Sequence, residues 1–197
     1  GQFELAVEKL KSSIAIEPNN VDAHYNLAIT YKDINEIDKA IESYKKVIEI
    51  NPKFAAAYNN LGNIFKESGR KHSAIAYYEK AIEINPKFAE AFNNLGNIFK
   101  DIDQFDNAIV SYKKVIELNK NFQDSYYNLG LTYKEQRKLN DAVTSFNNAI
   151  SLKSDFSEAY NELGVCYTLL GQMLDAISCF EAAIKLKKEY AVAYNNL

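Results

Sequence analysis

The sequence predicts an all-α protein built as a stack of helix-turn-helix units, and three observations lead to this prediction. The octapeptide NNLGNIFK occurs at residues 59–66 and again at residues 93–100. The hexapeptide INPKFA occurs at residues 50–55 and again at residues 84–89, which is the same offset. Leu95 and Phe99 lie one helical turn apart, as residues on the apolar face of a helix do. A fixed period of about 34 residues is typical of a stacked repeat array.

The period divides the chain into units of equal length. Full units are predicted at residues 21–54, 55–88, 89–122, 123–156 and 157–190. Residues 1–20 correspond to the second helix of a partial unit, and residues 191–197 correspond to the start of a further unit. We therefore expect residues 1–197 to form a single array, and we expect that array to continue in a longer protein.

The first helix of each unit shows a fixed order of side chains: a large residue, then Leu, a small residue and an aromatic residue. In the first full unit these are His24, Leu27, Ala28 and Tyr31. The small residue is glycine in the next four units, at Gly62, Gly96, Gly130 and Gly164. Glycine inside a helix costs about 1 kcal/mol relative to alanine. Its recurrence at one position predicts a close approach of two helices.

The second helix of each unit carries alanine at the twentieth position and a bulky residue four positions later. The alanines are Ala6, Ala40, Ala74, Ala108, Ala142 and Ala176. The bulky residues are Leu10, Tyr44, Tyr78, Tyr112, Phe146 and Phe180. We expect the alanine to lie opposite the glycine of the first helix, which would bring the two helix axes closer than the usual distance of about 8 to 10 Å.

Proline marks the end of the second helix in three units, at Pro18, Pro52 and Pro86, because a residue without an N–H group cannot continue a helix. The later units have Lys120, Ser154 and Lys188 at this position. In those units we expect the second helix to run on slightly.

These residues together resemble the tetratricopeptide repeat (TPR), a 34-residue helix-turn-helix unit. The resemblance covers essentially the whole chain. It implies a right-handed α-solenoid, or superhelix, whose first helices line a concave groove. It also implies a protein-protein interaction scaffold that binds a peptide or protein segment in that groove and that is not an enzyme.

Polar residues on the open face of the first helices are the candidate ligand contacts. Asparagine recurs at the sixth position, at Asn26, Asn60, Asn94, Asn128 and Asn196, and Glu162 interrupts this ladder. The predicted groove residues are Asn26, Asn59, Asn60, Asn63, Asn93, Asn94, Asn97, Asn128, Lys66 and Lys100. The ladder is similar to the one in the TPR superhelix of O-linked N-acetylglucosamine transferase, where such amides grip the main chain of a substrate. The alternative is that each asparagine bonds to the backbone of the adjacent unit and only packs the array.

Other kinds of site find little support in the sequence. Chaperone-type TPR proteins hold a terminal carboxylate with basic residues at the second and fifth positions, where this chain has residues such as Asp22 and Tyr25. His24 and His72 have no cysteine or second histidine at ligand spacing, so no metal site and no cofactor are predicted. Cys166 and Cys179 are expected to be free, buried thiols.

Composition limits the possible partners. The net charge of -3 provides no basic surface for nucleic acid. No apolar run approaches the roughly 20 residues that span a bilayer, and the N-terminus lacks a signal sequence, so a cytoplasmic location is the default expectation. Two further hypotheses remain open: the array is the substrate-recruiting arm of a larger enzyme such as a glycosyltransferase, or it associates end to end through uncapped terminal helices.

Overall fold

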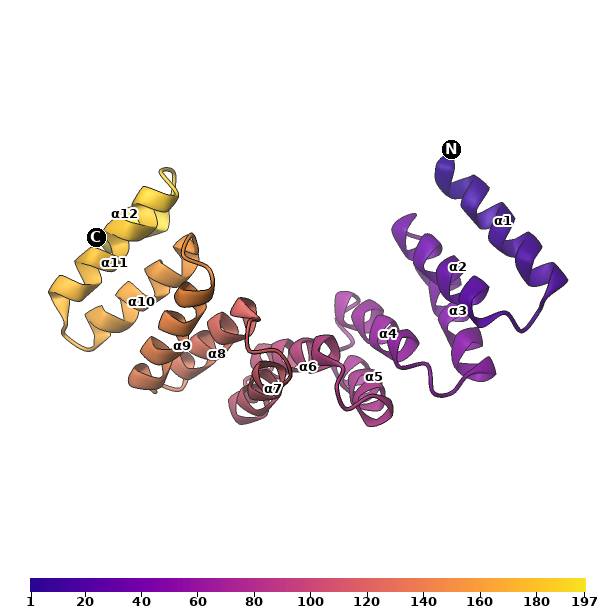
Figure 1. The fold of residues 1–197 in the computed structure, drawn as a ribbon, viewed down its shortest axis with the longest axis horizontal. Helices are drawn as coiled ribbons and strands as arrows, with labels where there is room; N and C mark the ends of the chain where they lie inside the picture. Colours follow the sequence, from indigo (N-terminus) through magenta and orange to yellow (C-terminus); the bar gives the residue numbers. More distant parts are fainter. The chain divides into compact units, whose positions relative to one another are not determined.

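The computed structural model describes residues 1–197 and contains twelve helices and no strands (Figure 1). The first helices of the units are α2 (Val21–Asp33), α4 (Ala55–Glu67), α6 (Ala89–Asp101), α8 (Gln123–Glu135), α10 (Ser157–Leu169) and α12 (Ala191–Asn196). The second helices are α1 (Gln2–Ile16), α3 (Ile37–Ile50), α5 (Lys71–Ile84), α7 (Phe105–Leu118), α9 (Leu139–Leu152) and α11 (Met173–Leu186). The prediction of an all-α array of helical repeats is confirmed.

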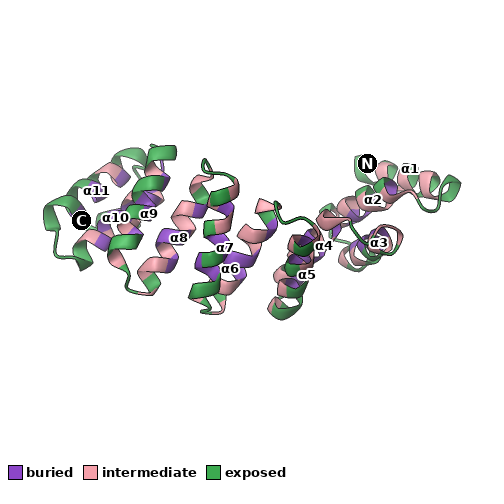
Figure 2. Ribbon diagram, turned by 60° about the horizontal axis from the view of Figure 1, so that its bottom comes forward, coloured by how far each residue is buried: buried purple, intermediate pink, exposed green.

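The helices fall into two compact units of packing, and the boundary lies inside α6. The N-terminal body comprises Gly1–Asn94 and the C-terminal body comprises Leu95–Leu197. Within each body, consecutive helices contact one another, as α4 does with α5 and α8 does with α9. In the C-terminal body, buried residues are spaced along each helix between exposed ones (Figure 2). The expectation of one continuous array over residues 1–197 stays a prediction.

The recurring glycines lie against aromatic rings. A Cβ atom added to Gly62 would lie 2.5 Å from Cε1 of Tyr78, and one added to Gly164 would lie 2.5 Å from Cε1 of Phe180. Gly96 and Gly130 face Tyr112 and Phe146 in the same way. The predicted close approach is therefore present. The expected neighbour was wrong, because the ring at the twenty-fourth position, and not the alanine at the twentieth, covers the glycine.

The second helices all end at the same position of the unit, whether or not proline follows. α3 ends at Ile50, before Pro52, and α9 ends at Leu152, although residue 154 is serine. The expectation that the helices run on at Lys120, Ser154 and Lys188 was wrong. The reason is burial of the aromatic residue that follows: Phe156 packs with Ala149 and Ala159, and the chain must leave the helix to place its ring there.

The turn inside each full unit has one residue with a left-handed backbone. These residues are Asn35 (φ 62°), Gly69 (φ 75°), Asp103 (φ 58°), Arg137 (φ 59°) and Gly171 (φ 76°). Glycine adopts this conformation freely, and asparagine and aspartate tolerate it better than other residues. Arg137 therefore carries a conformational cost that its counterparts avoid.

The two cysteines are free and buried, as predicted. Cys166 and Cys179 share one apolar cluster with Ala142, Phe146 and Leu163. Burial raises the pKa of each thiol to about 11, because desolvation disfavours the thiolate. Both side chains therefore serve as packing groups.

Candidate functional site

Asn60 joins two units of the N-terminal body through its side-chain amide. Its Nδ2 donates to the hydroxyl of Tyr25 at 3.0 Å and to the hydroxyl of Tyr44 at 3.1 Å. The Tyr25 ring lies between the rings of Tyr44 and Phe54, with centroid distances of 5.7 and 4.9 Å. Burial raises the pKa of both phenols, so they remain neutral and can accept these hydrogen bonds.

Asn94 makes the equivalent connection one unit later. Its Nδ2 donates to Oδ1 of Asn59 at 3.1 Å and to Oδ1 of Asn63 at 3.1 Å. Asn59 in turn donates from Nδ2 to Oε1 of Glu90 at 2.8 Å, and the Tyr78 hydroxyl donates to Oδ1 of Asn63 at 2.7 Å. The Glu90 carboxylate only accepts hydrogen bonds, so it orients the Asn59 amide with its oxygen toward Asn94.

These contacts decide what the ladder can offer to a ligand. An amide nitrogen carries two hydrogens, and in both Asn60 and Asn94 the nitrogen already makes two hydrogen bonds within the protein. Their Oδ1 atoms make no hydrogen bond, and both side chains are half-buried. At Asn60 and Asn94 the ladder therefore presents hydrogen-bond acceptors.

The C-terminal body repeats parts of this pattern. Oδ1 of Asn97 accepts from the Tyr112 hydroxyl at 2.8 Å and from Nδ2 of Asn128 at 3.4 Å. Nδ2 of Asn196 donates to Oδ1 of Asn161 at 3.0 Å. Asn128 and Asn196 thus bond to side chains of the preceding unit and not to its backbone.

Glu162, which interrupts the ladder, bonds to a charged partner that the ladder asparagines do not have. Its carboxylate forms an ion pair with Lys134, and the side chains are only 18% and 21% exposed. The same carboxylate accepts from Nδ2 of Asn161 at 3.4 Å. A half-buried ammonium group needs a counter-charge, which an amide cannot supply.

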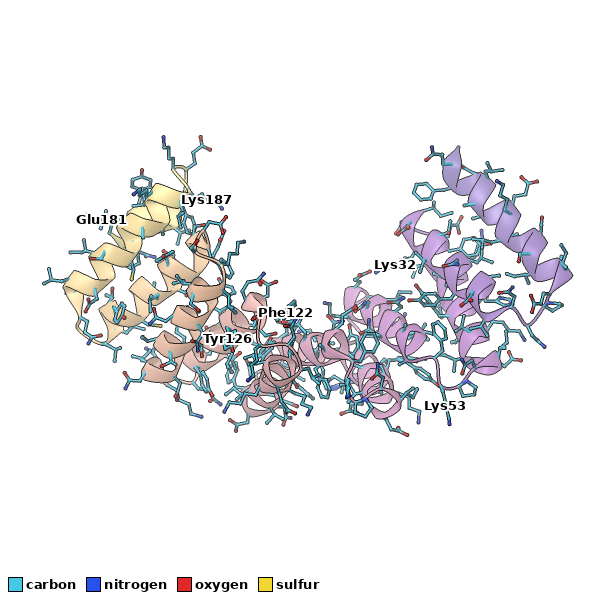
Figure 3. All side chains as sticks on the ribbon, in the orientation of Figure 1. Lys32, Lys53, Phe122, Tyr126, Glu181 and Lys187 are labelled. Atoms are coloured by element: carbon cyan, nitrogen blue, oxygen red, sulfur yellow. The ribbon has the colours of Figure 1, made fainter.

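The other predicted groove residues lie outside these networks. The side chain of Asn26 is exposed and makes no hydrogen bond, and Lys66 and Lys100 are half-buried and make no ion pair. Lys32, labelled in Figure 3, pairs instead with Glu67 of α4, with Nζ 2.9 Å from Oε1. Oδ1 of Asn93 is buried without a hydrogen-bond partner. The side chains of Lys66, Lys100 and Asn26 therefore keep their hydrogen-bond donors available.

Asn59 differs from the other predicted groove residues because it is only 1% exposed. Its amide is enclosed between Asn94 and Glu90. Its place in the candidate site is therefore that of a support that positions the half-buried ladder residue Asn94.

Sequence reasoning missed the tyrosines that hold the ladder. A signal for them exists within the repeats. Tyr78 and Tyr112 occur in units whose ninth residue is asparagine, whereas Phe146 occurs with Leu131, and Phe180 with Val165, at that position. In these four units the hydroxyl is present where an amide can accept from it, as in the hydrogen bond from Tyr112 to Asn97. The first full unit is different, because Tyr44 occurs with Ile29 and its hydroxyl accepts from Asn60 of the next unit.

Paired helices that repeat along the chain, joined by a row of amides, define a helical repeat protein of the α-solenoid class. The family model described as "TPR repeat" matches residues 1–35, 30–69 and 96–137. Models described as "Tetratricopeptide repeat" match residues 55–88 and 157–190, residues 77–110, and residues 123–156. The chain belongs to the TPR family.

Solved structures share this fold. YrrB, described as a TPR protein with an unusual peptide-binding site, is 21% identical with a TM-score of 0.83, covering 96% of this chain and 97% of YrrB. MamA is 28% identical with a TM-score of 0.79, covering 84% of this chain and 96% of MamA. PilF of Pseudomonas aeruginosa is 20% identical with a TM-score of 0.82, covering 99% of this chain and 89% of PilF. None of the curated protein sequences matches the chain.

TPR arrays are protein-interaction scaffolds, and they are typically non-catalytic. Membership of the family identifies protein or peptide as the general class of partner. None of the twelve helices has the length and apolar character needed to cross a bilayer.

Proposed function

We propose that the chain binds an extended peptide or protein segment along the open face of its first helices. The observation that carries this proposal is the free Oδ1 atom of Asn60 and of Asn94, held in place by two hydrogen bonds from each amide nitrogen. Side chains that are already ordered lose little entropy when a ligand binds. The peptide-binding site named for YrrB also supports a peptide ligand.

Main-chain N–H groups are the ligand atoms that fit these acceptors. First helices of adjacent units should lie about 10 Å apart, and an extended peptide advances about 3.3 Å per residue. One ladder oxygen would then meet about every third N–H group. Each bond contributes about 1 kcal/mol net, so the ladder positions the peptide, and other contacts must supply most of the affinity. The free ammonium group of Lys66 can donate to a peptide carbonyl.

Amide-to-ester substitution in the ligand tests this proposal without altering the protein. A peptide selected for binding from a library is resynthesised with one backbone N–H replaced by an ester oxygen at each position in turn, and affinities are measured by calorimetry. We expect a loss of affinity of about fivefold at about every third residue. A uniform profile along the peptide would contradict the proposal.

A protein variant provides the complementary test. The triple variant Asn60→Ala, Asn94→Ala, Asn128→Ala removes three ladder residues. The variant Asn147→Ala, Asn148→Ala on α9 removes exposed amides elsewhere and serves as a control. We expect weaker binding only in the triple variant. Unchanged affinity in a triple variant that keeps its fold would show that the ladder packs adjacent units and does not bind the peptide.

We infer a binding role and not a catalytic one, because polar side chains that recur once in every unit make a repeating surface and not a unique reaction site. A peptide ligand is also favoured over nucleic acid by the net charge of -3.

A second candidate partner is another copy of the chain. Apolar side chains are exposed on α1 and α11, including Phe3 (51%), Met173 (58%) and Leu174 (82%). Exposed apolar patches favour association. Sedimentation velocity over a wide range of concentration tests this, and Leu174→Lys should weaken any association observed. A single concentration-independent species of one chain would exclude it.

A further inference from the structure

A hollow of about 420 Å³ lies between α1, α2 and α3, in the N-terminal body and outside the ladder. Its apolar part consists of Ile14, Leu27 and Tyr31. Its polar part consists of Lys11, Lys39, Lys46, His24, Glu42 and Ser43. The volume is within the range of small-molecule sites, about 300 to 1,000 Å³, and an apolar surface with a few polar groups is their usual composition.

Two side chains that are smaller than their counterparts in the next unit leave this space open. The residues at the corresponding positions of the next unit are Tyr58 and Tyr77, where this unit has His24 and Ser43. The Tyr77 ring stacks on Phe65 with a centroid distance of 5.1 Å and lies 6.4 Å from the Tyr58 ring. The region that is open beside His24 and Ser43 is thus filled by aromatic rings in the next unit.

The Ser43 hydroxyl is unengaged. Serine at the same position of two other units donates to the backbone carbonyl four residues earlier, Ser111 to Asn107 at 2.9 Å and Ser145 to Asp141 at 2.8 Å. Ser43 makes no such bond and lines the hollow. Its hydroxyl is available to a ligand.

Three lysines line this hollow although the chain is acidic overall. Lys11 makes no ion pair. Lys39 and Lys46 pair with Glu36 at 3.2 Å and with Glu49 at 2.9 Å, on exposed parts of the surface where such pairs contribute little. The lining therefore carries three lysines and one carboxylate, that of Glu42. Lys11 is unpaired, and Lys39, whose Nζ also lies 5.7 Å from the centroid of the Tyr31 ring, and Lys46 can exchange their present carboxylates for a stronger partner.

His24 adds a fixed polar group. Its Nε2 donates to the backbone carbonyl of Pro18 at 2.9 Å, which orients the ring and leaves Nδ1 unengaged. It is also the only residue other than tyrosine or phenylalanine at the fourth position of the units. The same substitution thus opens the space and introduces a polar group.

We propose that this hollow binds a small phosphate monoester that carries an aromatic group. The phosphate oxygens accept hydrogen bonds from the lysine ammonium groups and from the Ser43 hydroxyl, donors that suit a compact group with several acceptor oxygens and two negative charges. The aromatic group packs against Ile14 and against the small exposed parts of Leu27 (6%) and Tyr31 (7%), at the place where the rings of Tyr58 and Tyr77 pack in the next unit.

The test uses the whole chain and phenyl phosphate as the probe, followed by the chemical shifts of backbone amides. We expect saturable shifts for His24, Lys39 and Ser43. Ser43→Tyr reproduces the side chain of Tyr77, fills the hollow and retains all three lysines. We expect it to weaken binding more than tenfold. Lys11→Gln, Lys39→Gln, Lys46→Gln together should have the same effect, and these exposed or half-buried lysines are not needed for the fold.

Lys114→Gln is the matched control. Lys114 occupies the position of Lys46 in a later unit and forms the same ion pair, with Glu117 at 2.8 Å, but it does not belong to the lining of this hollow. Its affinity for phenyl phosphate should equal that of the parent. Shifts that do not saturate, binding retained in Ser43→Tyr, or equally tight binding of phenol would each overturn the proposal, because they would indicate diffuse charge attraction or apolar contact alone.

Discussion

The hydroxyl of Tyr112 donates to Oδ1 of Asn97 at 2.8 Å, while the edge of its ring covers the backbone of the preceding residue, Gly96. One side chain thus fills the space left by the missing Cβ and orients an amide on the open face of α6. The packing between the paired helices and the geometry of the ladder therefore depend on the same residue.

Substitution of Gly96 by alanine should destabilise the protein, although alanine is the better helix former by about 1 kcal/mol. The new Cβ would lie 2.8 Å from Cε1 of Tyr112, closer than atoms of this kind pack. Overpacking typically costs about 1 to 3 kcal/mol. Urea unfolding measures the change, and a more stable variant would show that the ring moves freely.

The double substitution Phe146→Tyr, Leu131→Asn should be better tolerated than Phe146→Tyr alone. The single variant buries a hydroxyl beside Leu131, and an unsatisfied buried hydroxyl costs about 1 to 3 kcal/mol. The added asparagine reproduces the pair of Tyr112 and Asn97 and gives the hydroxyl an acceptor. A double-mutant cycle from urea unfolding measures the coupling between the two substitutions. A coupling energy of zero would contradict the idea that the asparagine accepts a hydrogen bond from the tyrosine hydroxyl, as Asn97 does from Tyr112.

Replacement of Arg137 by glycine should stabilise the protein by about 0.5 to 1 kcal/mol, because arginine at φ 59° is strained and glycine is not. The matched control is Gly69→Arg, which places arginine at the same turn position, where φ is 75°. The control should be destabilised by a similar amount. Thermal unfolding of both variants checks the signs, and a stabilised Gly69→Arg would contradict the argument.

Stability should decrease at alkaline pH. Burial raises the pKa of Tyr44, Tyr78, Tyr112 and Tyr127 above the ordinary value of 10.0. It also raises the pKa of Cys166 and Cys179 from 9.0 to about 11. Between the ordinary and the raised pKa, only the unfolded chain loses the proton, so ionisation favours unfolding. The contribution of these groups is complete below pH 9.0 and is lost progressively above it.

Urea unfolding at several values of pH measures this decrease. Each group contributes at most about 1.4 kcal/mol per pH unit. Tyr78→Phe should make the decrease shallower, whereas Tyr194→Phe, which removes an exposed hydroxyl, should not. A stability that stays constant up to pH values above 10.0 would mean that the phenols titrate normally in the folded protein.

Much of this protein follows from the sequence alone. The repeat period, the spacing of Leu95 and Phe99 and the recurring glycines determine the helix pairs and their close contact. Local rules suffice for this, because helix periodicity and glycine placement reflect interactions within one or two units. The burial of the two cysteines also follows from their positions on packed helices.

Only the tertiary structure decided which residue covers each glycine and how the ladder amides are oriented. The position of Phe146 over Gly130 depends on the crossing of two helices, which the sequence pattern does not specify. The Asn94 amide points its nitrogen inward because Asn59, held by Glu90 from the following unit, offers an oxygen there. Hydrogen-bond direction is set by such neighbours across units, so the acceptors that Asn60 and Asn94 present become apparent only when the units are packed together.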